Sequence, residues 1–185
     1  MMRMAAGIAA LSIAGCASPE PAPAPAGPAI ALRNAGFESP RRPGERCPVE
    51  WGCSMHSNPD SFRFWVEDRG AGSGAQSLCI ERVLPEPWAT AAQSVPAAAL
   101  RGRKVRFSLL MRGEGLDGEG ASPIIIATAG GATVEIAQNP ARIGAEWRRY
   151  SVELIVPPRA EALEVGTTLF GGGRACVDDA RLEPA

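Results

Sequence analysis

The last twelve residues of the chain, RACVDDARLEPA (residues 174–185), place two adjacent aspartates inside what otherwise reads as a β-strand. Aspartate is depleted in strands, and successive side chains of a strand point to opposite faces of a sheet. One of the two carboxylates must therefore face inward, where a charge without partners is costly. Because Ala180 and Leu182 suit a core and follow Asp178 at steps of two, we expect Asp178, and not Asp179, to be the inward residue.

Apolar and polar residues also alternate in three upstream segments, SFRFWVED (61–68), KVRFSLLMR (104–112) and WRRYSVELIV (147–156). A period of two is the pattern of a half-buried strand. The expected inward faces are Phe62, Phe64 and Val66; Val105, Phe107, Leu109 and Met111; and Tyr150, Val152, Leu154 and Val156. Further strands are predicted at 77–83, 122–128, 133–137, 162–170 and 174–183, and only VPAAALRG (95–102) suits a helical turn.

Glycine clusters separate the expected strands, at 70–74, 113–120, 130–131 and 171–173. Glycine is the residue that most often marks turns between strands. Many short strands joined by glycine-rich turns, without a convincing amphipathic helix, predict an all-β fold, either a β-sandwich or a barrel. The 185 residues suffice for one such domain with a sizeable core.

The order of four segments resembles the galactose-binding-like jelly roll. These segments are LRNAGFES (32–39), GSGAQSLCI (72–80), AAQSVPAAALRGRKVRFSLLMR (91–112) and the stretch from EWRRY to ARLE (146–183). They look most like carbohydrate-binding modules that open with N-x-G-F-E and close with V-D-D-x-x-L-E. The resemblance covers residues 31–183 and implies a jelly-roll β-sandwich. That fold hosts sugar binders, accessory domains and structural modules, so the fold alone implies no ligand.

The resemblance also implies a structural calcium ion. In such domains the first aspartate of V-D-D and the glutamate of G-F-E help to bind calcium beside the chain termini, and these positions match Asp178 and Glu38. Carbonyl oxygens of the GSGAQS turn would complete a shell of hard oxygen ligands. The alternative is that Asp178 accepts backbone N–H bonds without a metal, which also stabilises a buried carboxylate.

Residues 1–15 have the features of a bacterial signal peptide. Arg3 supplies the positive charge, and the apolar run from Met4 to Gly15 is too short to span a bilayer. The run ends in IAGC, which resembles a lipobox and implies that Cys16 is acylated; the alternative is an ordinary secretory signal. Ala17 resembles the outer-membrane sorting pattern of Gram-negative lipoproteins. Residues 16–29, rich in proline and alanine, predict a semi-rigid spacer, which leaves residues 30–185 as the folded domain.

Four cysteines remain in the domain: Cys47, Cys53, Cys79 and Cys176. An even number in an exported protein predicts disulfides. Cys47 and Cys53 bracket PVEWG, a sequence suited to a tight loop, so we expect these two to pair. Cys79 would then pair with Cys176, although alternation turns Cys79 outward and Cys176 inward. A bulge would reconcile the two directions; otherwise Cys79 pairs into the 47–53 loop.

The segment CPVEWGCSMHSNPDS (47–61) predicts a long, stapled loop, which is where a rigid scaffold often carries its binding residues. Trp51 is the candidate to stack on a sugar ring, and His56, Asn58 and Asp60 are the candidates for polar contacts. The alternative for Trp51 is that it plugs the end of the sandwich.

Composition and motifs argue against nucleic-acid binding and against catalysis. A formal net charge of −1 gives no electrostatic case for binding nucleic acid. The sequence has no G-x-S-x-G elbow and no phosphate-binding loop opening a helix, so we expect no enzyme. The prediction is a non-catalytic, membrane-anchored envelope lipoprotein, at the outer membrane, whose β-sandwich binds a glycan or another envelope ligand. The alternative is a structural or scaffolding lipoprotein that binds other envelope proteins.

Overall fold

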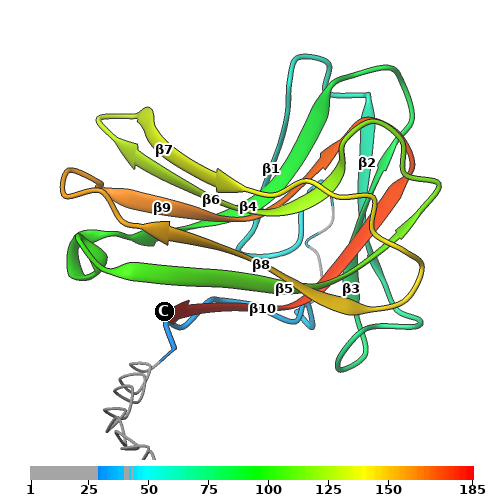
Figure 1. The fold of residues 1–185 in the computed structure, drawn as a ribbon. Helices are drawn as coiled ribbons and strands as arrows, with labels where there is room; N and C mark the ends of the chain where they lie inside the picture. The colour runs from blue at the N-terminus through cyan, green and yellow to red at the C-terminus, as the bar shows by residue number, and fades with distance from the viewer. Residues whose placement is uncertain (1–28, 40–41, 43) are drawn as a thin grey trace, which may run out of the picture.

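Ten antiparallel strands form two facing sheets in the computed structural model, which describes residues 29–39, 42 and 44–185 (Figure 1). The β9 sheet has the order β1 (Gly52–Met55), β4 (Trp88–Pro96), β9 (Ala162–Phe170), β6 (Gly120–Ala129) and β7 (Ala132–Gln138). The β10 sheet has the order β2 (Phe62–Glu67), β3 (Ser77–Arg82), β10 (Arg174–Pro184), β5 (Lys104–Glu114) and β8 (Arg148–Ile155). Within the described residues, one 3₁₀ turn, Ala98–Leu100, precedes β5. The predicted all-β jelly-roll sandwich is therefore confirmed, whereas the predicted signal peptide, Cys16 and most of the spacer lie outside the described residues.

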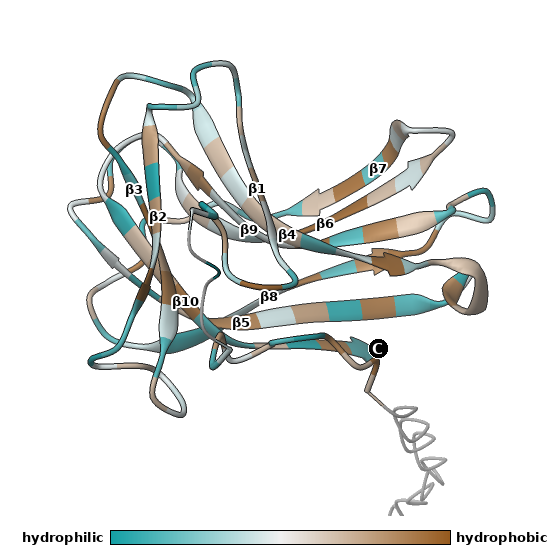
Figure 2. Cartoon of the chain, turned by 180° about the vertical axis from the view of Figure 1, so that it is seen from behind, coloured by the Kyte–Doolittle hydropathy of each residue, from teal (hydrophilic) through white to brown (hydrophobic). Residues whose placement is uncertain are grey.

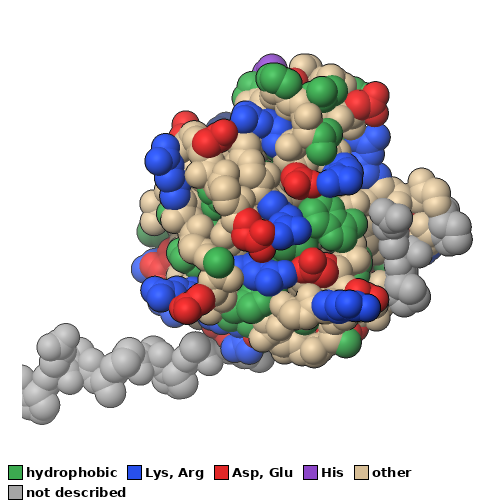
Figure 3. Space-filling view, turned by 90° about the vertical axis from the view of Figure 1, so that its right-hand side faces the viewer, with side chains coloured by type: hydrophobic (Ala, Val, Ile, Leu, Met, Phe, Trp, Pro, Cys, Tyr) green, Lys and Arg blue, Asp and Glu red, His purple; other side chains and the backbone are tan. Residues whose placement is uncertain are grey.

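The core lies between the two sheets and follows the alternation of the sequence. Along β5 the side chains of Val105, Phe107, Leu109 and Met111 are fully buried, and Figure 2 shows apolar and polar bands alternating along this strand. Removing such side chains from water supplies most of the favourable free energy of folding. On the side shown in Figure 3, arginine and acidic side chains are interspersed with hydrophobic ones.

Two strands were not predicted. β4 runs from Trp88 to Pro96, where no strand was predicted, and β1 occupies Gly52–Met55 inside the segment expected to be one long loop. Alanine is a poor strand former, and β4 contains three alanines, so its propensity was weak. It forms a strand because it pairs along its whole length with β9, from Trp88 opposite Phe170 to Pro96 opposite Ala162.

A β-bulge explains the two aspartates of β10. The register against β5 shifts between Asp178 and Arg181, and Asp179 has a positive φ of 45°, a conformation that aspartate tolerates better than most residues. The prediction that Asp178 shares a face with Ala180 and Leu182 is therefore wrong. Asp178 is fully buried, but its partner in register is Leu110, so it lies on the outer side of the sheet and not in the core.

The same bulge resolves the direction of the cysteines. Cys176 lies opposite Cys79 in register, and the two form a disulfide between neighbouring strands. Both point to the outer side of the β10 sheet, so the expectation that Cys176 faces inward is also corrected. Cys47 and Cys53 form the second disulfide, as predicted.

Candidate functional site

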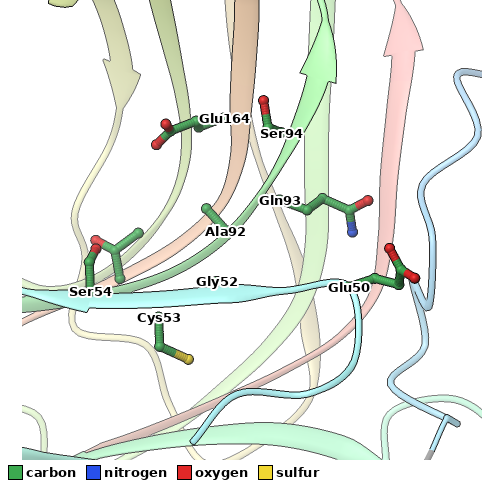
Figure 4. Close-up of a pocket in the computed structure, with 9 residues that line it drawn as sticks. Glu50, Gly52, Cys53, Ser54, Ala92, Gln93, Ser94 and Glu164 are labelled. Carbon is green, nitrogen blue, oxygen red and sulfur yellow. The ribbon is translucent and has the colours of Figure 1, made fainter. Parts of the chain in front are cut away.

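A groove of about 400 Å³ lies on the outer face of the β9 sheet, and we call it the β4 groove. Its lining residues come from β1, β4 and β9 and from the residues before β1: Glu50, Gly52, Cys53, Ser54, Thr90, Ala92, Gln93, Ser94 and Glu164 (Figure 4). Its size falls within the range of small-molecule sites in proteins.

The floor of the groove consists of two rows of residues that cross the strands. One row has small residues, Gly52 opposite Ala92 and Ala92 opposite Gly166. Gly166 is required because a Cβ there would collide with the carbonyl oxygen of Ala91. This row therefore makes a trough in the sheet.

The second row carries hydroxyl groups. Ser54 lies opposite Thr90, Thr90 opposite Thr168, and Thr168 opposite Ser122. The Thr90 and Thr168 hydroxyls are hydrogen-bonded to each other at 2.8 Å, which fixes both side chains. Ser122 is buried and bonds with the backbone of Pro123 and Asn139, so Ser54 is the hydroxyl of this row that faces the groove most openly.

The walls of the groove differ in charge. Glu50 pairs with Arg33, with 3.1 Å between Nη1 and Oε2. Gln93 exchanges two hydrogen bonds of 3.0 Å with the backbone of Arg33, so its amide holds the N-terminal segment in place. Glu164 is exposed and takes part in no ion pair with another described residue. The groove thus presents one carboxylate, from the central strand of the sheet, that is free to accept hydrogen bonds.

Aromatic side chains lie next to the groove, two residues before Thr90 along β4. Trp88 and Phe170 are opposite each other in register, on the same side of the sheet as Thr90, and both are partly exposed. The ring of His56 lies 6.0 Å from that of Trp88, in an edge-to-face arrangement. A partly exposed indole beside hydroxyl groups is a surface on which a sugar ring can stack.

His56 is held by an acidic residue of the next loop. The Glu86 carboxylate lies 2.9 Å from His56 Nδ1 and accepts hydrogen bonds from the backbone N–H and the hydroxyl of Ser57. The hydrogen bond from the Ser57 hydroxyl is the largest cause that holds the pKa of Glu86 below its usual value. His56 is thereby fixed beside Trp88, next to the β4 groove.

The other three predicted ligand residues lie elsewhere. Asn58 and Asp60 are exposed in the loop after β1; Asn58 accepts a bond from the Asp60 backbone N–H, and Asp60 lies 3.9 Å from Arg46. Trp51 is only 6% exposed, packs against Phe37 with ring centroids 4.9 Å apart, and donates from Nε1 to the carbonyl of Asn34. The prediction that Trp51 stacks on a ligand is contradicted by this burial, because a ring inside the core offers no face to a sugar.

Sequence reasoning missed the residues that line the groove, apart from Cys53. A signal was present in WATAAQSVP (88–96), where Trp88, Thr90 and Ser94 share one face of the alternation and the apolar Ala89, Ala91 and Val95 share the other. The segment carried no strand prediction, because three of its nine residues are alanine, a poor strand former.

The predicted calcium ligands do come together. Glu38 Oε1 accepts from the backbone N–H of Ala75 at 2.8 Å and of Gln76 at 3.2 Å, and Asp178 accepts from the N–H of Ser73 at 2.7 Å and of Asp179 at 2.6 Å. Both carboxylates therefore bind the backbone around the turn at Gly74. That turn needs glycine, because its φ is +63° and a Cβ would collide with Glu38.

The electrostatics of this pair suit a cation. Burial is the largest cause that raises the pKa of Asp178 to about 6; the two backbone hydrogen bonds oppose this rise, and the charges of Asp179 and Glu38 add to it. A bound cation would oppose this effect. Glu38 and Asp178 supply only two carboxylates, whereas calcium takes six to eight oxygen ligands, so backbone carbonyls would have to provide others. Calcium remains a prediction.

The described residues contain one group of three possible metal-ligating side chains, Glu67 with Cys79 and Cys176. The two cysteines form a disulfide and have no thiolate to offer. Within the same residues, no helix has the length and apolar character needed to cross a bilayer.

Comparison with known proteins bears on the fold. No family model and no curated protein matches the sequence. A xylan-binding CBM22-1 domain of Xyn10C from Paenibacillus barcinonensis matches with a TM-score of 0.57 at 14% identity, over 81% of this chain and 91% of that one. TmCBM61, solved in complex with β-1,4-galactotriose, matches with a TM-score of 0.51 at 17% identity, over 83% and 97%.

A different kind of protein shares the fold. The enzymatically active domain of tailspike protein 4 from bacteriophage CBA120 matches with a TM-score of 0.61 at 12% identity, over 82% of this chain. This chain spans about a fifth of that one. At these identities the likeness establishes a sandwich of the kind found in carbohydrate-binding modules, and the residues of the groove must carry any functional argument.

Proposed function

We propose that this protein is a lipoprotein of the cell envelope whose β-sandwich binds a glycan in the β4 groove. The observation that carries the proposal is the groove itself: a trough of small residues beside a hydroxyl row, with the free carboxylate of Glu164 in one wall and Trp88 beside the groove. The likeness to a xylan-binding domain and to a galactotriose-binding module supports it.

The chemistry of the groove suits a sugar chain. A carboxylate can accept two hydroxyl groups at once, and hydrogen bonds to a charged acceptor are stronger than neutral ones. The Ser54 and Ser94 hydroxyls both donate and accept. Because these groups lie on paired strands of a sheet, little conformational freedom is lost when a ligand binds.

A substitution in the wall tests this proposal. The Glu164→Gln variant keeps the shape of the side chain but removes its charge, so we expect its affinity for a bound polysaccharide to fall about tenfold, as for a lost charge-assisted hydrogen bond. Affinity electrophoresis in gels containing xylan, β-1,4-galactan or soluble peptidoglycan fragments would measure it. Glu135→Gln, an exposed glutamate of β7, is the matched control and should bind like the wild type. Equal binding by both variants would exclude Glu164 as a contact.

The anchor rests on the sequence. The IAGC motif and the proline-rich segment that follows support acylation of Cys16 and sorting to the outer membrane. We expect the Cys16→Ser variant to leave the membrane fraction, because the remaining sequence has no other apolar segment long enough to anchor it. Fractionation of cell envelopes with wild type and variant side by side is the measurement; a variant that still sediments with membranes would show that the lipobox assignment is wrong.

We propose no catalytic role. The Ser57 hydroxyl, His56 and Glu86 lie close together, but Ser57 donates to Glu86 and not to the imidazole. A serine nucleophile needs its hydroxyl bonded to the base, with the acid behind the base. The acid here lies between the other two, so the cluster supports a structural role in holding the loop beside Trp88.

The alternative function, a scaffolding lipoprotein, is favoured by one observation on the other sheet. Arg63 lies over the ring of Trp65 and Arg112 over the ring of Trp147, at 5.7 and 5.1 Å from the ring centroids. Tryptophan and arginine are the residues most enriched at energetic centres of protein interfaces. Capture of an envelope protein that is lost in Trp65→Ala but kept in Glu164→Gln would favour this alternative.

A further inference from the structure

The chain enters and leaves the domain at the same end of the sandwich. The Ile30 N–H donates to the Leu182 carbonyl at 2.8 Å, and the Ala185 N–H donates to the Lys104 carbonyl at 3.0 Å. Since the bridge between Ile30 and Leu182 is antiparallel, Ala29 lies toward the C-terminal end of β10. In Figure 1 the start of the described chain accordingly lies beside the C-terminus.

Two loops at this end are joined and carry basic side chains. The Gly102 N–H donates to the Val156 carbonyl, and the Val156 N–H donates to the Arg103 carbonyl. We call the exposed residues of these loops the tether end: Arg101, Arg103, Lys104, Ile155 and Arg159. No acidic residue occurs in the sequence between Glu86 and Glu114.

Positive charge is in excess at the tether end. Lys104 is paired with Glu153, but Arg101, Arg103 and Arg159 take part in no ion pair among the described residues. Glu161 is the one acidic residue of these loops, and it accepts a hydrogen bond from the Gly130 N–H. Arg101 donates from Nε to the Ala160 carbonyl at 2.7 Å, so the guanidinium groups of Arg103 and Arg159 are the ones most available to a partner.

An aliphatic side chain projects among these cations. Ile155 is 67% exposed, more than any other large hydrophobic residue of the described chain, and it lies opposite Lys104 in register. A single exposed aliphatic side chain is ordinary on a protein surface. Its place among basic residues is what matters, because cations beside an apolar side chain are the pattern that binds the surface of an anionic bilayer.

We propose that the tether end rests on an anionic lipid surface, with its arginines at the phosphates and Ile155 at the boundary of the acyl chains. The inference uses the acylation of Cys16 proposed above, but its test does not. Thirteen residue steps separate Cys16 from Ala29, so the anchor lies at most about 45 Å from the domain even along a fully extended chain. A short tether raises the effective concentration of its two ends to about the millimolar range, so a weak surface affinity is sufficient.

The arrangement has a consequence for the β4 groove. The groove lies on the flank of the sandwich, over β1, β4 and β9, and not at the tether end. A domain resting on its tether end would hold the groove to the side, open to a polymer layer that runs along the membrane.

The test uses the unacylated mature chain, from Ala17 to Ala185. All buried core residues lie between Phe37 and Leu182, so this chain keeps the core. We expect it to co-sediment with vesicles of phosphatidylethanolamine and phosphatidylglycerol, to bind phosphatidylcholine vesicles several-fold less, and to be released by salt. Arg159→Gln should lower the partition coefficient about fivefold, as expected for one basic side chain near an anionic surface.

Two further variants test the apolar contribution to vesicle binding and its restriction to the tether end. Ile155→Ser should weaken binding to anionic vesicles about threefold or more, through lost apolar burial. Arg148→Glu is the control, because Arg148 is 71% exposed but begins β8 at the opposite end of the sandwich, and it should bind like the wild type. Equal binding to neutral and anionic vesicles, or a loss caused equally by Arg148→Glu, would overturn the proposal.

Other occupants of the surface would give different results. If the tether end joined two copies of the chain, sedimentation velocity without vesicles would show a dimer that Ile155→Ser dissociates. If it held a single phosphate group, glycerol phosphate would displace the protein from vesicles at millimolar concentration. Either result would overturn the membrane assignment, and neither would bear on glycan binding in the β4 groove.

Discussion

The outer faces of the two sheets use their charged residues in opposite ways. On the β10 sheet, Arg63, Glu81, Arg174 and Glu114 form one row across four strands, and the row closes into two ion pairs, Arg63 with Glu81 and Arg174 with Glu114. On the β9 sheet the corresponding surface is a trough with hydroxyl groups, and the carboxylate of Glu164 has no charged partner among the described residues.

This difference between the two faces indicates which of them is expected to bind a ligand. A face whose charges bind one another offers few free hydrogen-bonding groups, whereas the β4 groove keeps several that only water or a ligand can satisfy. Exposed ion pairs contribute little to stability, so the row on the β10 sheet does not explain why that face is ordered. The disulfide between Cys79 and Cys176, which lies in the neighbouring row on the same face, is the stronger candidate for that role.

Removing each disulfide separately tests this comparison between the two faces. Replacing Cys79 and Cys176 by alanine removes a link between residues 97 apart in sequence, whereas replacing Cys47 and Cys53 removes a link between residues six apart. Loop-closure entropy predicts losses of about 4–5 and about 2 kcal/mol in the free energy of unfolding, measurable by urea denaturation.

Binding should show the reverse order. Glu50 and Gly52 line the β4 groove and lie within the loop that Cys47 and Cys53 close, so this double variant should weaken polysaccharide binding more than the other double variant does under conditions where both are folded. If both double variants lost equal stability, or if only the Cys79 and Cys176 variant lost binding, the division of roles between the faces would be wrong.

Titration of the Asp178 carboxyl should change the free energy of unfolding by less than loss of the Cys79–Cys176 disulfide does, and it tests the structural role of the β10 sheet. Its pKa is raised to about 6 in the folded state, mainly by burial, and is about 3.9 when unfolded. The folded state therefore holds the proton more tightly, so this group stabilises the fold below about pH 4, and the contribution is lost as the pH rises through 6. The loss is at most about 3 kcal/mol.

Urea denaturation of the wild type and Asp178→Asn between pH 4 and 7 isolates this contribution. The variant has no carboxyl to titrate, so the difference in stability between the two proteins should change with pH in the stated direction.

Calcium binding at the same two carboxylates is tested separately. If Glu38 and Asp178 bind calcium, adding it to chelator-treated protein should release heat in calorimetry, raise Tm and flatten this pH dependence. Parallel pH profiles would refute the titration, and the absence of heat and thermal shift would refute calcium.

Much of the fold was predictable from the sequence, because apolar and polar residues alternate along the strands of the β10 sheet. The apolar positions of β5 and β8 face the core as predicted, the Cys47–Cys53 disulfide was predicted, and the Cys79–Cys176 disulfide was one of the two pairings left open for Cys79. The direction of Asp178 was not predictable, because a bulge changes which face a residue occupies and leaves no clear mark in the sequence beyond a residue suited to positive φ, Asp179.

The candidate site was predicted poorly for a physical reason. β4 is rich in alanine, so neither propensity nor side-chain size distinguishes it from a loop, and its pairing with β9 is a long-range interaction that a local pattern does not contain. Trp51 was predicted to contact a ligand because a tryptophan ring can stack on a sugar. A large ring is more often buried than exposed, however, and Trp51 packs on Phe37. His56 was a predicted site residue, whereas its neighbour Trp88 was not.

Filling the β4 groove tests the central claim most directly. Ala92 lies between Gly52 and Gly166 on the floor, so in Ala92→Leu the added atoms occupy the trough and leave the core unchanged. We predict that the wild type binds at least one neutral polysaccharide among xylan, β-1,4-galactan and peptidoglycan fragments in isothermal titration, that Ala92→Leu weakens this binding at least tenfold, and that Tm is unchanged. A wild type that binds none of them, or an Ala92→Leu variant that binds as tightly as the wild type, would contradict the account.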